Sequence, residues 1–254
     1  MSAGQGLLYS LYERRLLKEI EGGNLPQHIG VILDGHRRFA RAEGLEDYQQ
    51  SYMQGMRRFE EFLEWAQNPR IPAITAWVLS PQNLERPREE LDPYFDVLID
   101  LFDRLPALAE RFDLRLRAIG RLDLLPGHLA LAAKGLSEAR PDGSATLNIA
   151  LSYGGREEIA DAARSLVEDL VDNGVPPQDL ADHITVSSLA GHMYSADIPD
   201  ADLLIRTSGE SRLSGFLLWQ SAYAEFAFVD VYWPAFRRVD YLRTLRDFSL
   251  RRRR

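Results

Sequence analysis

Apolar residues recur along the chain in two patterns, helical stripes and short continuous runs. Helical spacing predicts amphipathic helices, and runs of about 4–8 apolar residues rich in β-branched side chains predict buried strands. The predicted helices span 7–20, 52–65, 88–112, 126–139, 157–171 and 240–254, with shorter, weaker ones at 180–184 and 186–190. The predicted strands span 29–33, 73–79, 114–119, 146–151, 203–205 and 226–229. We expect Pro106 to kink or split the 88–112 helix.

Strands that alternate with helices predict an α/β domain with a mostly parallel central β-sheet flanked by helices. No internal repeat, linker or shift in composition marks a boundary. We therefore expect one main domain (26–254), preceded by an N-terminal amphipathic helix (1–25). Ligands of such sheets bind beyond the carboxyl ends of the strands. The polar clusters after strands 29–33, 73–79, 146–151 and 203–205 are therefore expected to meet at one rim.

Composition narrows the class of protein. The 254 residues carry a net charge of −8 and include no cysteine, which excludes disulfides, thiolate metal sites and cysteine nucleophiles. A general nucleic-acid binder is usually basic, so no nucleic-acid partner is expected. No apolar run approaches the roughly 20 residues of a membrane span, and the charged N-terminus lacks a signal-peptide core. We expect a cytoplasmic protein without a transmembrane segment, and the Arg251–Arg254 tail leaves peripheral membrane contact open.

A basic cluster follows the first predicted strand. Asp34-Gly35-His36-Arg37-Arg38 is an acid, a glycine and basic side chains at the point where a helix is expected to begin. A glycine lets backbone N–H groups approach a ligand, a helix N-terminus favours anions, and two arginines can bind phosphate oxygens bidentately. The aspartate suits a Mg²⁺ ion that bridges those oxygens. A solvated strand-to-helix turn is the alternative explanation that the residues alone leave open.

A second cluster of the same kind follows strand 203–205. It contains Arg206, Arg212 and Ser214 with two glycines, and it could hold a second anion. Glu225 lies further along among aromatic residues, where a carboxylate needs a metal or an arginine as partner. The chain has no P-loop, G-x-G-x-x-G or G-x-S-x-G motif, and its histidines lack metal-ligand spacing. Two anion sites and a Mg²⁺ site suit an enzyme that joins two phosphorylated, otherwise apolar substrates.

Four segments resemble the motifs of one enzyme family. They are HIGVILDGHRRFA at 28–40, LSPQNLERP at 79–87, NIALSYGGR at 148–156, and DLLIRTSGESRLSGFLLWQSAYAE at 202–225 followed by WPAF at 233–236. In their order and spacing they resemble the cis-prenyltransferases, the undecaprenyl diphosphate synthase-like isoprenyl transferases, from about Pro26 onward. The resemblance is strongest to the short-chain, Z-farnesyl diphosphate type. It implies a Mg²⁺-dependent condensation of isopentenyl diphosphate with an allylic diphosphate (dimethylallyl, geranyl or farnesyl) in a homodimer with an apolar tunnel.

The resemblance also implies a role for individual residues. Asp34, His36 and Asn83 would be catalytic, with Asn83 a proton acceptor, and Asp34 and Glu225 would bind the metal. The implied substrate-binding residues are Gly35, His36, Arg37, Arg38, Phe39, Ser80, Leu84, Arg86, Arg206, Arg212, Leu213 and Ser214. Of these, the Asp34–Arg38 cluster would hold the allylic diphosphate, and Arg206, Arg212 and Ser214 the isopentenyl diphosphate.

Two departures from the family pattern carry expectations of their own. His36 stands where the family usually has asparagine. With an ordinary pKa near 6.5, it would make the reaction rate more dependent on pH. Val78 stands where long-chain members have a small residue, and its bulk in the tunnel wall favours a short product of about C15.

The sequence leaves open which reaction is catalysed and what the C-terminal arginine tail does. A longer-chain synthase, a head-to-middle (lavandulyl-type) coupling of dimethylallyl diphosphate and a non-catalytic partner subunit remain as alternatives. His28, just before the first strand, is interpreted as structural. The Arg251–Arg254 tail would either complete a partner's site or replace a lost C-terminal motif.

Overall fold

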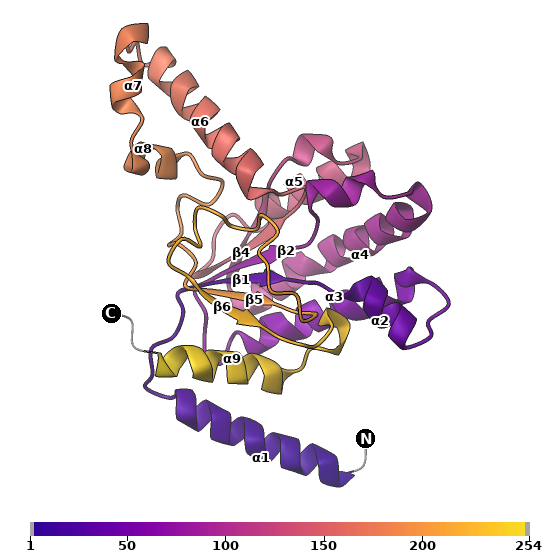
Figure 1. The fold of residues 1–254 in the computed structure, drawn as a ribbon. Coiled ribbons are helices and arrows are strands. Elements are labelled where there is room, and N and C mark those ends of the chain that lie inside the picture. Colours follow the sequence, from indigo (N-terminus) through magenta and orange to yellow (C-terminus); the bar gives the residue numbers. More distant parts are fainter. Residues whose placement is uncertain (1–2, 252–254) are drawn as a thin grey trace.

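A computed structural model describes residues 3–251, with side chains from Tyr9 onward. Within these residues the chain folds around a six-stranded sheet in the order β3-β4-β2-β1-β5-β6, and every pairing is parallel. The strands are β1 (His28–Ile32), β2 (Ala73–Trp77), β3 (Leu114–Ile119), β4 (Ala145–Ala150), β5 (Leu203–Arg206) and β6 (Glu225–Phe228). The predicted parallel α/β architecture is confirmed (Figure 1).

Apart from the short helix His36–Ala42, which no apolar stripe predicts, the helices fall where expected to within a few residues. They are α1 (Ala3–Ile20), α2 (His36–Ala42), α3 (Tyr48–Trp65), α4 (Arg88–Phe112), α5 (Gly127–Ala139), α6 (Gly155–Asp172), α7 (Leu180–His183), α8 (Val186–Gly191) and α9 (Arg238–Leu250). Helix α9 ends at Leu250 rather than continuing through the arginine tail, of which residues 252–254 lie outside the described part of the chain.

Pro106 does not split the helix, because α4 is continuous from Arg88 to Phe112. Leu105 and Ala109, on either side of the proline, are buried in the main core. Tertiary packing of an apolar face contributes more to helix stability than local propensity does. The burial of these neighbours therefore holds the helix together across a residue that lacks an N–H donor.

The sheet separates two apolar layers. Residues of β1 and β4 are buried throughout, as expected for strands covered on both faces. The larger layer packs α3, α4, α5 and α9 on one face, and a smaller one packs Tyr153, Phe216 and Leu217 on the other. Figure 1 shows α1 lying along α9 at one side of the molecule, while α6, α7 and α8 form an arm that projects from the body. None of the described helices has the length and apolar character of a membrane span.

Strand order places a cleft at the middle of the sheet. From β1 the chain builds one side of the sheet with β2, the edge strand β3 and then β4 between them, and it crosses to the other side as β5 and β6. The reversal falls between β1 and β5, and open α/β sheets bind ligands beyond the carboxyl ends of the strands at such a point. Asp34 follows β1 and Arg206 ends β5, so the two predicted clusters meet there.

Candidate active site

Asp34 and Arg206 form the centre of the site. The Arg206 Nη2 atom lies 2.8 Å from Asp34 Oδ2, and the guanidinium side chain is only 7% exposed. Two hydrogen bonds hold the backbone of Asp34 in place. The Asp34 N–H donates to Thr207 Oγ1, and the Asp34 carbonyl accepts from the Trp233 N–H. Burial opposes ionisation of Asp34, but hydrogen bonds and charge from Arg206 outweigh it and hold the pKa below its ordinary value. The carboxylate is therefore ionised at neutral pH.

Gly35 is required by the turn between β1 and α2. Its φ of 106° lies in the left-handed region, and a Cβ there would come within 2.8 Å of the Tyr232 ring and 3.1 Å of Ser208 Cβ. Only glycine fits such a backbone without strain. The tight turn brings Arg38, near the start of α2, to Ser208 just after β5.

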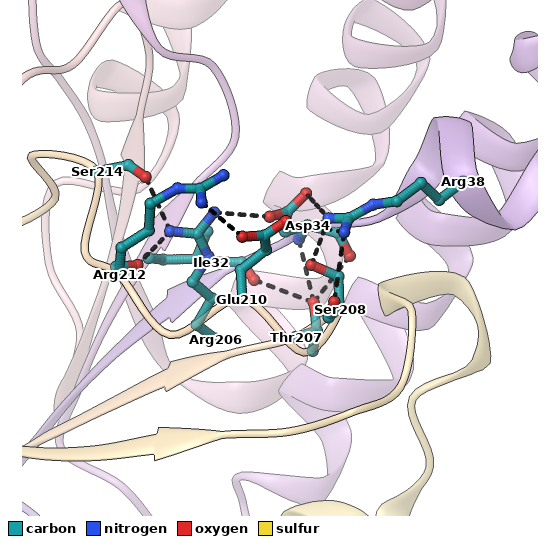
Figure 2. A network of polar contacts seen from close by, with 9 residues as sticks. All are labelled: Ile32, Asp34, Arg38, Arg206, Thr207, Ser208, Glu210, Arg212 and Ser214. Carbon is teal, nitrogen blue, oxygen red and sulfur yellow. Dashed lines mark hydrogen bonds and ion pairs between the residues drawn. The ribbon is translucent and has the colours of Figure 1, made fainter.

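Arginines from both clusters converge around Asp34, as Figure 2 shows. Arg38 donates to Ser208 Oγ at 2.7 Å and pairs with Glu210 at 2.9 Å, while Arg212 pairs with the other Glu210 oxygen at 2.8 Å. Arg206 also donates to Ser214 Oγ at 2.8 Å and to the Arg212 carbonyl. Side chains that are more than 160 residues apart in sequence thus form one polar network. Such a set of fixed guanidinium groups is suited to phosphate oxygens.

The loop after β2 closes a third side of the site. Ser80 caps a short 3-10 turn, Pro81–Glu85, and its N–H donates to Asn83 Oδ1 at 3.0 Å while Asn83 N–H donates back to Ser80 Oγ at 3.2 Å. The amide oxygen of Asn83 is therefore held in place by Ser80. Arg86 follows and pairs with Glu90 at 3.1 Å.

These elements enclose a cavity of about 520 Å³. Predicted residues that line it are Asp34, Gly35, His36, Arg37, Arg38, Ser80, Asn83, Arg86, Arg206, Arg212 and Ser214. Its apolar wall is made by Ile32, Leu33, Tyr52, Trp77, Val78, Leu79 and Tyr94. Three of the predicted substrate-binding residues are not part of the lining. Phe39 is buried in α2, and Leu84 and Leu213 pack against the two core layers.

Three residues of this region were not predicted from the sequence. Glu210 lines the cavity between the arginines, and Glu90 pairs with both Arg86 and Arg37. Tyr94 lies on the apolar wall, 4.6 Å from Tyr52 between ring centroids. Glu210 was visible in the 202–225 motif as a carboxylate between two arginines. Glu90 and Tyr94 sit in the first turns of an ordinary amphipathic helix, where nothing in the pattern marks them.

The expectation that His36 titrates near neutral pH is wrong. Its ring packs against Gly55 of α3, in the space a side chain would otherwise fill, and Nδ1 lies 3.2 Å from the Ser51 carbonyl. Burial lowers the pKa of His36 to about 4, opposed by the Ser51 carbonyl and the Asp34 charge. The imidazole is therefore neutral at physiological pH, and its titration does not add a pH dependence in that range.

Glu225 does not join Asp34 within one chain. It begins β6 and is in register with Leu203 of β5, which is in register with Ile29 of β1. Asp34 lies five residues beyond Ile29, which separates the two carboxylates by roughly 16 Å along the strand direction alone. Glu225 instead pairs with Arg251 at 3.1 Å. The predicted two-carboxylate metal site is thus not formed by a single chain.

The remaining donors still suit a magnesium–diphosphate complex. Among the described residues no group of three or more histidine or carboxylate side chains could cage an ion. Mg²⁺, however, is commonly bound through one or two carboxylates together with substrate phosphates and water. Asp34, with its side chain 28% exposed at the cavity, and the arginines around it fit that arrangement.

The fold and this site define a class of enzyme. A parallel α/β sheet carries a polar, arginine-rich centre at its switch point, beside an apolar wall. Such a cavity can bind molecules with a phosphate head and an apolar tail, and it places two arginine groups around one carboxylate. These are the features of a transferase that acts on diphosphate esters.

Comparison with known proteins identifies the family. Residues 32–254 match the family model described as "Putative undecaprenyl diphosphate synthase", and the chain belongs to this family of prenyltransferases. It is 45% identical to the (2Z,6E)-farnesyl diphosphate synthase of Thermobifida fusca, over 97% of this chain and 96% of that one. It is 44% identical to the tritrans,polycis-undecaprenyl-diphosphate synthase (geranylgeranyl-diphosphate specific) of Methanopyrus kandleri, over 97% and 90%.

A solved structure supports the same assignment. The lavandulyl diphosphate synthase of Lavandula x intermedia, in complex with dimethylallyl diphosphate, superposes with a TM-score of 0.83 at 30% sequence identity. The match covers 90% of this chain and 97% of that one. Two relatives named for different products are thus 45% and 44% identical to this chain, so the product has to be argued from the cavity.

Proposed function

We propose that this prenyltransferase condenses isopentenyl diphosphate with an allylic diphosphate, in the presence of Mg²⁺, to form a new Z double bond. The observation that carries the proposal is that Arg38 and Arg206 pair with Asp34, and Arg212 with the nearby Glu210, beside an apolar wall. The two arginine clusters supply two diphosphate subsites, and the wall takes the apolar tail. Dimethylallyl, geranyl and farnesyl diphosphate are the candidate allylic substrates.

The residues act by stabilising charge and fixing geometry. When the allylic C–O bond breaks, negative charge builds on the leaving diphosphate, and Arg37 and Arg38 stabilise it electrostatically. Mg²⁺ held at Asp34 would neutralise further charge on the same oxygens. Arg206, Arg212 and Ser214 hold the second diphosphate so that its alkene faces the allylic carbon. We assign to Asn83, whose amide oxygen accepts from the Ser80 N–H, the role of accepting the proton that is lost once the new carbon–carbon bond has formed.

The apolar wall favours a short product of about C15, because added bulk in a tightly packed tunnel wall opposes a longer tail. Val78 lines the cavity, and its carbonyl accepts a 2.6 Å hydrogen bond from the Tyr94 hydroxyl. Tyr94 in turn packs on Tyr52. Two tyrosine rings and Val78 thus form one continuous wall between α3, α4 and β2, which a longer tail would have to displace.

A homodimer is part of the proposal. Phe226 and Phe228 lie on the edge strand β6 with exposed fractions of 37% and 43%, and their rings stack at 6.3 Å. Tyr223 just before them is 94% exposed. Adjacent exposed aromatic residues on a sheet edge are typical of a surface covered by a partner. Glu225 lies on the same strand, so a metal-binding role for it would have to be played across the dimer.

Membrane contact is the last element of the proposal. The outer side of α1 combines exposed Leu11 with the exposed cations Arg14 and Lys18, next to α9. Exposed apolar and basic groups together favour the surface of an anionic membrane. We propose a cytoplasmic enzyme that touches the membrane through this face, and cosedimentation of the protein with anionic vesicles, lost in Lys18→Glu, tests it.

Consumption of labelled isopentenyl diphosphate tests the main proposal. The purified protein is incubated with Mg²⁺ and with each allylic diphosphate in turn. We expect a discrete extended product with at least one primer and none in Asp34→Ala. Absence of product with every primer would contradict it.

Head-to-middle coupling is the second candidate, and the likeness to the lavandulyl diphosphate synthase structure favours it. Incubation with dimethylallyl diphosphate alone separates the two reactions. Only head-to-middle coupling gives a product without isopentenyl diphosphate.

A further inference from the structure

Glu210 lies between the arginines of the two proposed diphosphate subsites. Its Oε1 atom accepts from Arg38 Nη1 at 2.9 Å, and its Oε2 atom lies 2.8 Å from Arg212 Nη1. Figure 2 shows this carboxylate among the groups that surround Asp34. Arg38 belongs to the proposed allylic subsite and Arg212 to the isopentenyl subsite. One side chain therefore links both.

The bridge occupies hydrogen-bond donors that a bound diphosphate would need. Arginine binds carboxylate and phosphate oxygens through the same N–H groups. A diphosphate that takes the Nη1 donor of Arg38 therefore displaces Glu210 Oε1, and one that takes the Nη1 donor of Arg212 displaces Oε2. The two displacements involve the same side chain, so they are not independent.

The solvent exposure of the side chains indicates which ion pairs of the site a diphosphate can displace. Arg206, paired with Asp34, is 7% exposed, whereas Arg38 and Arg212 are 39% and 68% exposed. Ion pairs in contact with water are weakened by solvent and salt. The Glu210 bridge is thus the part that a more highly charged diphosphate can displace, while the Arg206–Asp34 pair stays in place.

We propose that Glu210 is a positioning residue that couples the binding of the two diphosphates. The inference rests on the proposed function, because it assigns one substrate to each arginine. In the free protein Glu210 holds Arg38 and Arg212 in place and competes with both substrates. The first diphosphate to bind has to break the contacts of Glu210 with the arginines, which costs free energy. The second diphosphate then binds to arginines that Glu210 has already released, so its binding does not carry that cost.

Coupling of this kind is reciprocal. If the allylic diphosphate raises the affinity for isopentenyl diphosphate by some factor, isopentenyl diphosphate raises the affinity for the allylic ligand by the same factor. Because the ion pairs are exposed and weak, we expect about fivefold, the low end of typical coupling factors. Removal of the Glu210 charge should abolish the coupling and tighten the binding of each ligand alone.

Calorimetric titration without turnover tests this. The probes are isopentenyl diphosphate and an allylic thiolodiphosphate, whose C–S bond resists ionisation, each titrated alone and with the other at saturation. The proteins are the wild type, Glu210→Gln, Glu210→Asp and the control Glu43→Gln, which changes an exposed glutamate at the end of α2. Each titration is made with Mg²⁺ and again with EDTA.

The expected result is about fivefold mutual tightening in the wild type and in Glu43→Gln, and none in Glu210→Gln. Glu210→Gln should also bind each single probe more tightly than the wild type, and Glu210→Asp should restore part of the coupling. Retained coupling in Glu210→Gln, or weaker single-probe binding by it, would overturn the inference while leaving the proposed function standing. Failure of the wild type to bind either probe would overturn both.

Discussion

The carboxylate of Asp34 and the guanidinium of Arg206 lie 2.8 Å apart and join the carboxyl ends of β1 and β5. The pair therefore places opposite charges at the point where the strand order of the sheet reverses. Arg206 uses its planar group three ways, since it also contacts Ser214 and the Arg212 carbonyl. A residue with the same charge but a different shape would therefore not replace it.

Arg206→Lys should lower kcat/KM by about 10²-fold, because an ammonium group cannot make the forked contacts of arginine and a preorganised charge is lost from the site. Steady-state kinetics with isopentenyl diphosphate as the varied substrate measure this. Arg164→Lys, on the exposed face of α6, is the matched control and should leave the kinetics unchanged. Wild-type kinetics in Arg206→Lys would show that the fork is not needed.

Val78→Ala should lengthen the product by removing bulk from the apolar wall of the cavity. The measurement is the size of the dephosphorylated product. Val97→Ala makes the same change in a buried valine of α4 that does not line the cavity, so it should destabilise the fold without changing product length. An unchanged distribution of products in Val78→Ala would remove this residue from the account of chain length.

Acid should destabilise the folded protein through His28. Its ring lies 2.8 Å from Thr75 Oγ1 and from the Pro199 carbonyl, and burial lowers its pKa to about 4. Between pH 6.5 and 4 the unfolded chain binds more protons than the folded one, so stability is full above about pH 6.5 and falls as pH drops. For this residue alone we expect a loss of about 1.4 kcal/mol in the free energy of unfolding at pH 5.5.

Urea unfolding at pH 7.5 and 5.5 measures this loss. His28→Gln should be less stable at pH 7.5 yet lose less stability on acidification than the wild type. His128→Gln, which changes an exposed histidine, should lose as much as the wild type. An equal acid loss in His28→Gln and in the wild type would contradict the assignment.

Phe228→Glu should convert the proposed dimer to a monomer, because it places a charge on the exposed aromatic pair of the edge strand. Light scattering after size exclusion gives the mass in solution. Leu131→Glu, which changes an exposed leucine of α5 far along the chain, should stay dimeric. A monomeric wild type at micromolar concentration would contradict the proposed interface.

Much of the site followed from the sequence, for a physical reason. Asp34 follows β1 and Arg206 ends β5, and parallel strands end at a common edge of the sheet, so their proximity could be predicted from the sequence. The structural interpretation of His28 is confirmed by its complete burial between β1 and β2.

Other features depended on packing that no local pattern reveals. His36 is neutral because Gly55, on a different helix, leaves room for its ring. Glu225 is remote from Asp34 because β6 begins at that residue, which places it at the opposite end of the sheet. The expectation for His36 used the ordinary pKa of histidine, and the one for Glu225 used the family resemblance. Neither shows which side chains surround the residue in the folded chain.

The geometry of the newly formed double bond is the most direct test of the proposed cis condensation. The protein is incubated with Mg²⁺, ¹³C-labelled isopentenyl diphosphate and the primer it accepts, and the dephosphorylated product is examined by NMR. We expect the wild type to form a Z double bond at the added unit, and we expect this product to be lost in both Asp34→Asn and Arg206→Met. An E double bond, or an extended product that persists in these two variants, would contradict it.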